Sequence, residues 1–122
     1  MTNHQISIAF KEYTGLTKMP EADKNLCLEA FRALDTSHSP YSKFRVGVAL
    51  LLRSGKILQG SNQENVVYPS GLCAERVALF NWSANHANDP IVTMAITAQT
   101  NEFSLTKPVT SCGACLQVMA EC

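Results

Sequence analysis

Residues 44–52, with the sequence FRVGVALLL, decide the fold class of this chain. From Val46 onward the stretch is apolar at every position, so a strand built from it presents apolar side chains on both faces. Such a strand is typical of the inside of a sheet that helices cover above and below. Ser54-Gly55 is a tight-turn signal and Lys56–Gly60 then returns as a second strand, which predicts a β-hairpin.

Helical patterns lie on either side of this hairpin. Apolar residues recur at helical spacing from Glu21 to about Leu34, and a second helix is predicted from Leu72 to about Ala84. Ile91–Ala98 has the pattern of a third strand that is apolar on both faces, and Cys112–Cys122 opens a last helix. The order helix, strand, strand, helix, strand, helix predicts an α/β fold with a sheet between two layers of helices.

The chain has 122 residues, which is the length of one domain. We assign residues 21–122 to that domain and residues 1–20 to an N-terminal extension. In the extension Ile6, Ile8 and Phe10 alternate with polar or small residues. This pattern indicates a strand or an arm that is laid across a neighbouring molecule.

Composition narrows the classes of function. Ten basic and ten acidic residues give a formal net charge of +0, and no run of Lys or Arg is present, so a small substrate is favoured over a polynucleotide. The longest strongly apolar run, Val46–Leu52, is too short to cross a bilayer. The N-terminal residues lack the zones of a secretory signal. Five cysteines without such a signal indicate a reducing cytoplasm, in which thiols serve a metal or the core.

The chemistry of the chain is carried by C-A-E at residues 73–75 and C-G-A-C at residues 112–115. Catalytic zinc sites use three protein ligands and keep the fourth position for water, and three thiols fill three positions. Both segments follow helix-start signals, and the positive end of a helix favours a thiolate. Positions two apart on a regular helix point about 200° apart. Cys73 and Glu75 can therefore face one site only if Cys73 lies in the helix cap.

Other interpretations of the cysteines remain open. A C-x-x-C pair alone is shared by structural zinc, redox and iron–sulfur sites, but a redox pair leaves Cys73 and Glu75 without a role. A closed structural zinc site would need Cys27 or Cys122 as its fourth ligand. Cys27 lies between two leucines of an amphipathic helix, where a buried free cysteine is common. We therefore favour a catalytic zinc site with a free carboxylate.

With these residues the chain resembles the small, single-domain cytidine deaminases, specifically their three-cysteine, homotetrameric branch. Order and spacing agree from about Leu26 to the end, and residues 1–20 lie outside the resemblance. Four segments carry it: YSKFRVG at 41–47, NQEN at 62–65, CAER at 73–76 and CGACLQV at 112–118. The resemblance implies a three-layer α/β/α sandwich with a mixed sheet. It also implies one zinc ion per chain and a nucleoside substrate. The expected assembly is a cytoplasmic homotetramer, with a homodimer as the alternative.

The resemblance also implies roles for single residues, which fall into zinc-site and substrate-site groups. The zinc site would comprise the ligands Cys73, Cys112 and Cys115, the proton shuttle Glu75, and Arg76, which would donate to the thiolates and offset their charge. The substrate site would comprise Phe44 stacked on the pyrimidine, Asn62 and Glu64 on the ribose hydroxyl, the Ala74 backbone on the base, and Tyr68 near the subunit boundary.

Several of these residues have ordinary alternatives when the resemblance is set aside. Phe44 at the start of a strand is by default a core aromatic residue. Asn62 and Glu64 follow a glycine in a loop and are typical turn and surface residues. Arg76 on a helix is usually solvated, and Tyr68 before a proline is an ordinary loop aromatic. Only the three thiols and the glutamate of the C-A-E motif carry their interpretation unaided.

Three features depart from the pattern of the family. Ser111 stands where a proline usually precedes the second cysteine, and its hydroxyl can cap the helix. Leu116 replaces a common arginine. The loss of that positive charge is expected either to slow turnover or to be offset by Arg76. The family usually continues with more sheet beyond Cys122.

The implied activity is hydrolytic deamination of cytidine or deoxycytidine to the uridine product plus ammonia, as in pyrimidine salvage. One alternative is a deaminase of another aminated ring, such as blasticidin S or a nucleotide. Glu64 argues against a nucleotide, because its charge would repel a nearby phosphate. A second alternative is a catalytically weak zinc-binding protein that is retained for assembly.

Overall fold

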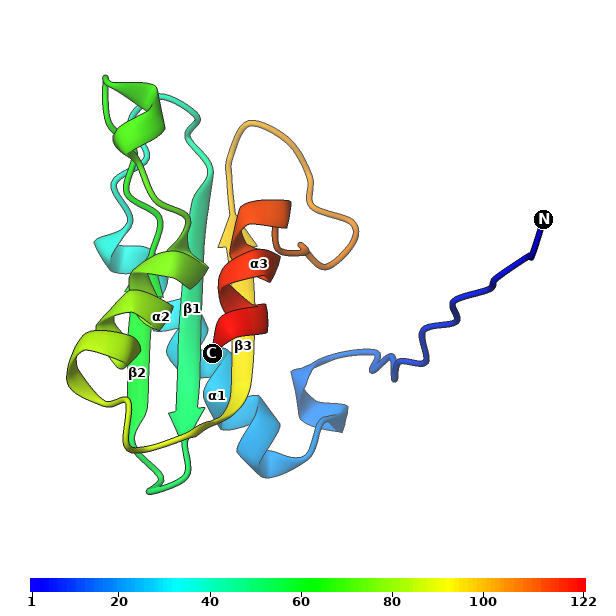
Figure 1. The fold of residues 1–122 in the computed structure, drawn as a ribbon. Helices are drawn as coiled ribbons and strands as arrows, with labels where there is room; N and C mark the ends of the chain where they lie inside the picture. The colour runs from blue at the N-terminus through cyan, green and yellow to red at the C-terminus, as the bar shows by residue number, and fades with distance from the viewer.

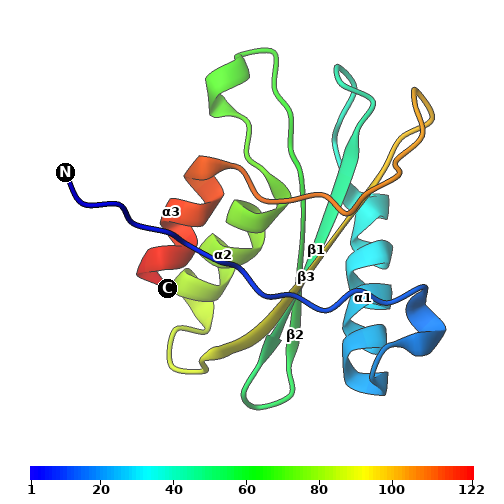
Figure 2. The same cartoon turned by 90° about the vertical axis from the view of Figure 1, so that its right-hand side faces the viewer.

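A three-stranded sheet lies between helices on both of its faces (Figure 1, Figure 2). The computed structural model describes residues 1–122. Helix α1 covers one face of the sheet, and helices α2 and α3 cover the other. The elements are α1 (Glu21–Ala33), β1 (Arg45–Leu52), β2 (Ile57–Ser61), α2 (Ala74–Asn85), β3 (Ile91–Gln99) and α3 (Gly113–Glu121), with short 3₁₀ turns at Leu16–Lys18, Leu34–Thr36 and Tyr68–Ser70. The predicted three-layer sandwich is confirmed.

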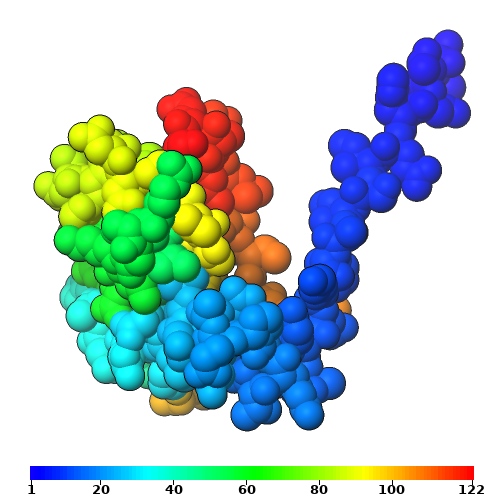
Figure 3. All heavy atoms as spheres, turned by 90° about the horizontal axis from the view of Figure 1, so that it is seen from below, coloured from blue at the N-terminus to red at the C-terminus, as the bar shows by residue number.

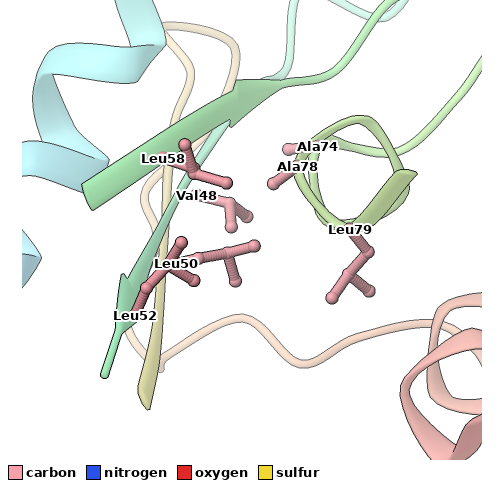
Figure 4. Close-up of a cluster of buried hydrophobic side chains, with 7 residues drawn as sticks. All are labelled: Val48, Leu50, Leu52, Leu58, Ala74, Ala78 and Leu79. Atoms are coloured by element: carbon pink, nitrogen blue, oxygen red, sulfur yellow. The ribbon is translucent and has the colours of Figure 1, made fainter. Parts of the chain in front are cut away.

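The central strand β1 sends alternate side chains into two separate hydrophobic clusters. Val48, Leu50 and Leu52 pack with α2 residues on one face (Figure 4). Ala49 packs on the other face with Leu26 and Ala30 of α1. The unbroken apolar run of β1 is explained by this burial on both faces, as the sequence predicts.

All strand pairs in this sheet are antiparallel, which corrects the expectation of a mixed sheet. The strand order is β2-β1-β3, and β1 pairs antiparallel with both neighbours. The β1–β2 hairpin makes the first pair antiparallel. The connection through α2 then returns the chain to the far edge of β1, so β2 and β3 run in the same direction without being neighbours. A parallel pair would require those two strands to be adjacent.

Two glycines allow the helices to approach the sheet closely. A Cβ at Gly47 would lie 2.1 Å from the carbonyl oxygen of Ala30 in α1. A Cβ at Gly60 would lie 2.6 Å from the carbonyl oxygen of Ala74 in α2. Only a residue without a side chain fits at these contacts. Gly60 therefore sets the distance between β2 and the first turn of α2.

The N-terminal residues extend away from the folded body (Figure 3). Residues 1–13 form no helix or strand in this single chain. The strand that was one of two predictions for this segment is therefore not formed within the chain. Ile6, Ile8 and Phe10 are all more than four-fifths exposed. Among the helices, none combines the length and the apolar character that crossing a membrane requires.

Candidate metal centre

Two helices begin side by side, and each begins at one of the predicted cysteine ligands. Cys73 is the N-cap of α2 and Cys112 is the N-cap of α3, and both have extended backbone conformations. Cys115 lies in the first turn of α3 and is fully buried. The prediction that Cys73 lies in the helix cap is confirmed. Its extended backbone frees it from helical spacing, so Cys73 and Glu75 line the same cavity.

The three sulfur atoms form a compact group. The Cys73 and Cys112 sulfurs are 3.9 Å apart, and those of Cys112 and Cys115 are 3.4 Å apart. All three lie within 4.8 Å of one another. Zn–S bonds of about 2.3 Å in a tetrahedron place sulfurs about 3.8 Å apart. The three thiols thus fit one zinc ion, and Cys27 and Cys122 lie outside the group, so a closed four-cysteine site does not form.

The pKa values of two of the thiols are shifted in opposite directions. Burial raises the pKa of Cys115 to about 12, and a hydrogen bond with Cys112 and the charge of Glu75 add to the rise. The pKa of Cys112 is lowered, chiefly by the backbone N–H of Cys115 in the first turn of α3. A buried thiol with so high a pKa needs a cation beside it to become a thiolate. This requirement is the ordinary chemistry of a zinc ligand.

Arg76 places a positive charge beside the sulfurs. Its Nη2 donates a hydrogen bond to the Cys73 sulfur at 3.7 Å. This hydrogen bond is the main reason that the pKa of Arg76 is raised. The Nε of the same guanidinium is buried without a hydrogen-bond partner. Arg76 is therefore not the solvated surface residue that its place on a helix would indicate.

A cavity of about 690 Å³ opens beside the sulfurs, a volume typical of small-ligand sites. Its walls include every predicted site residue except Cys115, which lies buried behind it. Glu75 lines the cavity although it is only 5% exposed. The predicted members on the walls are Phe44, Asn62, Glu64, Tyr68, Cys73, Ala74, Glu75, Arg76 and Cys112.

Asn62 and Glu64 line this cavity and also hold the segment that leads into β1. Asn62 Oδ1 accepts a hydrogen bond from the Val46 backbone N–H at 2.8 Å, and its Nδ2 donates to the Phe44 carbonyl at 2.9 Å. Glu64 Oε1 accepts from the backbone N–H groups of Tyr41 and Ser42, both at 3.1 Å. Much of their hydrogen-bonding capacity is thus used within the protein.

The structure also shows where three further residues from the sequence analysis lie. Tyr68 is 82% exposed at the rim of the cavity. Leu116 is 55% exposed and does not line the cavity. The prediction that Ser111 caps the last helix is wrong, because the N-cap is Cys112 and no side chain makes a capping hydrogen bond.

The loop between β3 and α3 contributes residues that sequence reasoning missed. Pro108, Val109 and Thr110 form part of the cavity wall. Phe103 from the same loop stacks on Phe44. The sequence did hold a signal for these wall residues: the segment that contains them ends at Cys112, a predicted metal ligand, so it must pass beside the metal.

Comparison with known proteins agrees with this geometry. A family model described as "Cytidine and deoxycytidylate deaminase zinc-binding region" matches residues 1–111, including the N-terminal residues that lie outside the four motifs. The chain belongs to this deaminase family. It is 44% identical over 96 residues to the cytidine deaminase of Halalkalibacterium halodurans, covering 79% of this chain and 68% of that protein. It is 40% identical over 98 residues to that of Sporosarcina psychrophila, covering 80% and 68%.

Solved structures of cytidine deaminases share the fold of this deaminase-family chain. The structure from Burkholderia pseudomallei superimposes with a TM-score of 0.68 at 36% identity, over 83% of this chain and 75% of that one. The structure from Mycobacterium tuberculosis has a TM-score of 0.69 at 28% identity, over 84% and 78%. The family resemblance implied by the four motifs is thereby confirmed.

Proposed function

We propose that this chain is a zinc-dependent hydrolase that converts cytidine or deoxycytidine and water to the uridine product and ammonia. One observation carries the proposal: three sulfurs at the spacing of a zinc tetrahedron lie at the edge of a cavity that Glu75 also lines. Three protein ligands leave a coordination position open, which is the mark of a catalytic rather than a structural zinc site.

In this proposal Cys73, Cys112 and Cys115 hold the zinc ion. When bound, zinc supplies the Lewis acidity that makes a water molecule nucleophilic near neutral pH. Glu75 accepts a proton from that water and delivers it to ring N3, so C4 becomes open to attack. The water oxygen bonds to C4, and Glu75 takes the second proton from that oxygen and passes it to the amine. The C4–N bond then breaks, so ammonia leaves and the C4 carbonyl of the uridine product remains. Arg76 offsets the negative charge of the thiolates through its hydrogen bond to Cys73.

The cavity walls support a nucleoside as the substrate. Phe44 supplies an aromatic surface for the pyrimidine, and the Ala74 backbone lies in the first turn of α2 beside the metal centre. Asn62 Nδ2 retains one N–H for a ribose hydroxyl, and Glu64 Oε2 has only a long contact of 3.4 Å within the chain. The carboxylate of Glu64 favours a free ribose over a phosphate, because like charges repel.

We also propose that the protein acts as a homotetramer in the cytoplasm, in pyrimidine salvage. The exposed loop at the rim of the cavity supports self-association: Val66, Val67 and Tyr68 are 80%, 62% and 82% exposed. Contiguous exposed apolar residues beside a binding site are typical of an interface. A partner subunit that covered this loop would also enclose the cavity beside Tyr68.

The test is a spectrophotometric assay of cytidine loss on protein of measured zinc content, with and without a chelator. We expect one zinc per chain and turnover that the chelator abolishes. Glu75→Gln is expected to keep the zinc and to lose about a hundred- to ten-thousandfold in kcat, since general acid–base catalysis supplies a factor of 10²–10⁴. Full zinc without turnover of any pyrimidine nucleoside would refute the activity, and faster turnover of a nucleotide or of blasticidin S would refute the substrate.

A further inference from the structure

Phe44 contacts the cavity and, separately, a second aromatic ring. The centroids of the Phe44 and Phe103 rings are 5.9 Å apart and their planes are inclined by 18°, which is an offset stack. Phe44 lines the cavity, whereas Phe103 does not. Phe103 therefore meets Phe44 on a part of the ring that is turned away from the cavity. Phe103 itself is 56% exposed.

The backbone just before Phe44 is strained and is fixed from two directions. Lys43 has a φ of 58°, which is in the left-handed region that non-glycine residues rarely adopt. The Thr100 hydroxyl donates a hydrogen bond to the Lys43 carbonyl at 2.9 Å. From the other side, the Glu64 carboxylate accepts hydrogen bonds from the backbone at Tyr41 and Ser42. The conformation that presents Phe44 is thus held by side chains from two other loops.

One loop links the support of Phe44 to the metal centre. After β3 it begins at Thr100, whose hydroxyl also accepts a hydrogen bond from the Glu102 backbone N–H at 3.2 Å. It then carries Phe103, forms part of the cavity wall at residues 108–110, and ends at Cys112. The position of Phe103 is therefore set by a segment anchored at both ends.

We propose that Phe103 is a positioning residue for the proposed deaminase reaction: it holds the Phe44 ring in the orientation that stacks on the substrate base, and Thr100 anchors the loop that presents it. A half-buried phenylalanine at the start of a strand has rotational freedom that a second ring restricts. A preorganised stacking surface improves binding of an aromatic base because less freedom is lost when the substrate arrives. The inference rests on the proposed function for the identity of the substrate, while the ordering of Phe44 stands on the structure alone.

The kinetic test compares Phe103→Ala, Phe103→Leu and Phe103→Tyr with a control, Phe31→Ala. Phe31 is a matched control because it is 54% exposed, lies on α1 and does not line the cavity. We expect the alanine and leucine variants to raise KM for cytidine roughly two- to tenfold, the factor that an aromatic pair supplies, with kcat changed less than about twofold. Tyrosine restores the stack, so Phe103→Tyr should retain the native KM.

A second measurement does not depend on activity. With 4-fluorophenylalanine at position 44, the ¹⁹F spectrum reports the order of that ring and its neighbour's ring current. We expect Phe103→Ala to shift and broaden the resonance, Thr100→Val to broaden it, and Phe31→Ala to leave it unchanged.

An unchanged KM in both the alanine and leucine variants, or an unchanged ¹⁹F resonance in Phe103→Ala, would overturn the inference. A loss of zinc or an equal fall in kcat in the Phe103 variants would also overturn it, because the loop would then act on the metal centre rather than on Phe44. If the native protein turns over no pyrimidine nucleoside, the proposed function fails, and the ¹⁹F comparison alone decides whether Phe103 orders Phe44.

Discussion

Replacing Gly60 with alanine tests whether strand–helix packing positions the metal centre. The new Cβ would lie 2.6 Å from the Ala74 carbonyl oxygen, 2.7 Å from the Ala78 nitrogen and 2.8 Å from the Ala78 Cβ. These atoms belong to the helix backbone and to the core, so no flexible side chain can yield. The first turn of α2 must then move by roughly 0.7–0.9 Å to restore ordinary contacts of about 3.5 Å.

Such a movement exceeds what a metal site tolerates, because ligand distances hold to about ±0.2 Å. Cys73 directly precedes Ala74 and moves with it. We expect Gly60→Ala to lower the free energy of unfolding by about 1–3 kcal/mol, the usual cost of overpacking. We also expect zinc affinity to fall about 10- to 100-fold, as when the support of a metal ligand is lost.

Zinc affinity is measured by competition with a chelator of known affinity, and stability by urea unfolding. The matched control is Gly113→Ala. Gly113 lies between two of the predicted ligands, yet a Cβ there meets nothing within 4 Å, so both quantities should stay close to native. A Gly60→Ala protein with native zinc affinity would refute the reasoning, because it would show that the start of α2 does not depend on this contact.

Three further perturbations address other parts of the molecule. Glu64→Gln should lower the free energy of unfolding by about 1 kcal/mol at pH 7. Burial raises the pKa of Glu64, but hydrogen bonds from Ser42 and Tyr41 outweigh the effect of burial and lower the pKa overall. The stabilisation is therefore present above pH 4.5 and disappears as the pH falls further. If the urea midpoints of the native and Glu64→Gln proteins differ equally at pH 7 and pH 3, this expectation is contradicted. Leu116→Arg should change kcat less than about threefold, because position 116 is exposed and water screens the added charge; a tenfold rise would show that the arginine acts on the zinc. Removal of the metal with a chelator should release α3 before the rest of the fold. Amide hydrogens in residues 113–121 should then exchange faster than those in β1. Equal protection of α3 and β1 in the chelated protein would contradict this.

The elements of this fold could be predicted because each has an apolar pattern of its own. The all-apolar run of β1 predicted burial on both faces, and two clusters on opposite faces confirm it. Sheet direction could not be obtained in the same way, because local periodicity does not encode which strands become neighbours. The expected mixed sheet came from the family resemblance alone, and it was wrong for the three strands of this chain, whose two pairs are both antiparallel.

The cluster of three cysteines was predictable because zinc chemistry restricts both residue type and spacing. The requirement that Cys73 and Glu75 serve one site predicted the cap position of Cys73, which the structure confirms. The pairing of Phe44 with Phe103 could not be predicted, because the two residues are brought together by long-range strand pairing between β1 and β3. Loop residues carry no periodicity that would announce such a contact.

The metal centre bears on the fold as well as on the chemistry. In α3 the only buried residue is Cys115, while Val118 and Met119 are partly buried against the main cluster. A helix with so little buried surface is weakly held by packing alone. Burial also leaves Cys115 with a pKa of about 12, so its thiolate is unfavourable unless a cation lies beside it. Zinc would reverse both effects at once, because bonds from one ion to Cys73 and Cys115 join the starts of α2 and α3. In the proposed site, the ion that activates water would thus also secure the helix that forms one side of that site.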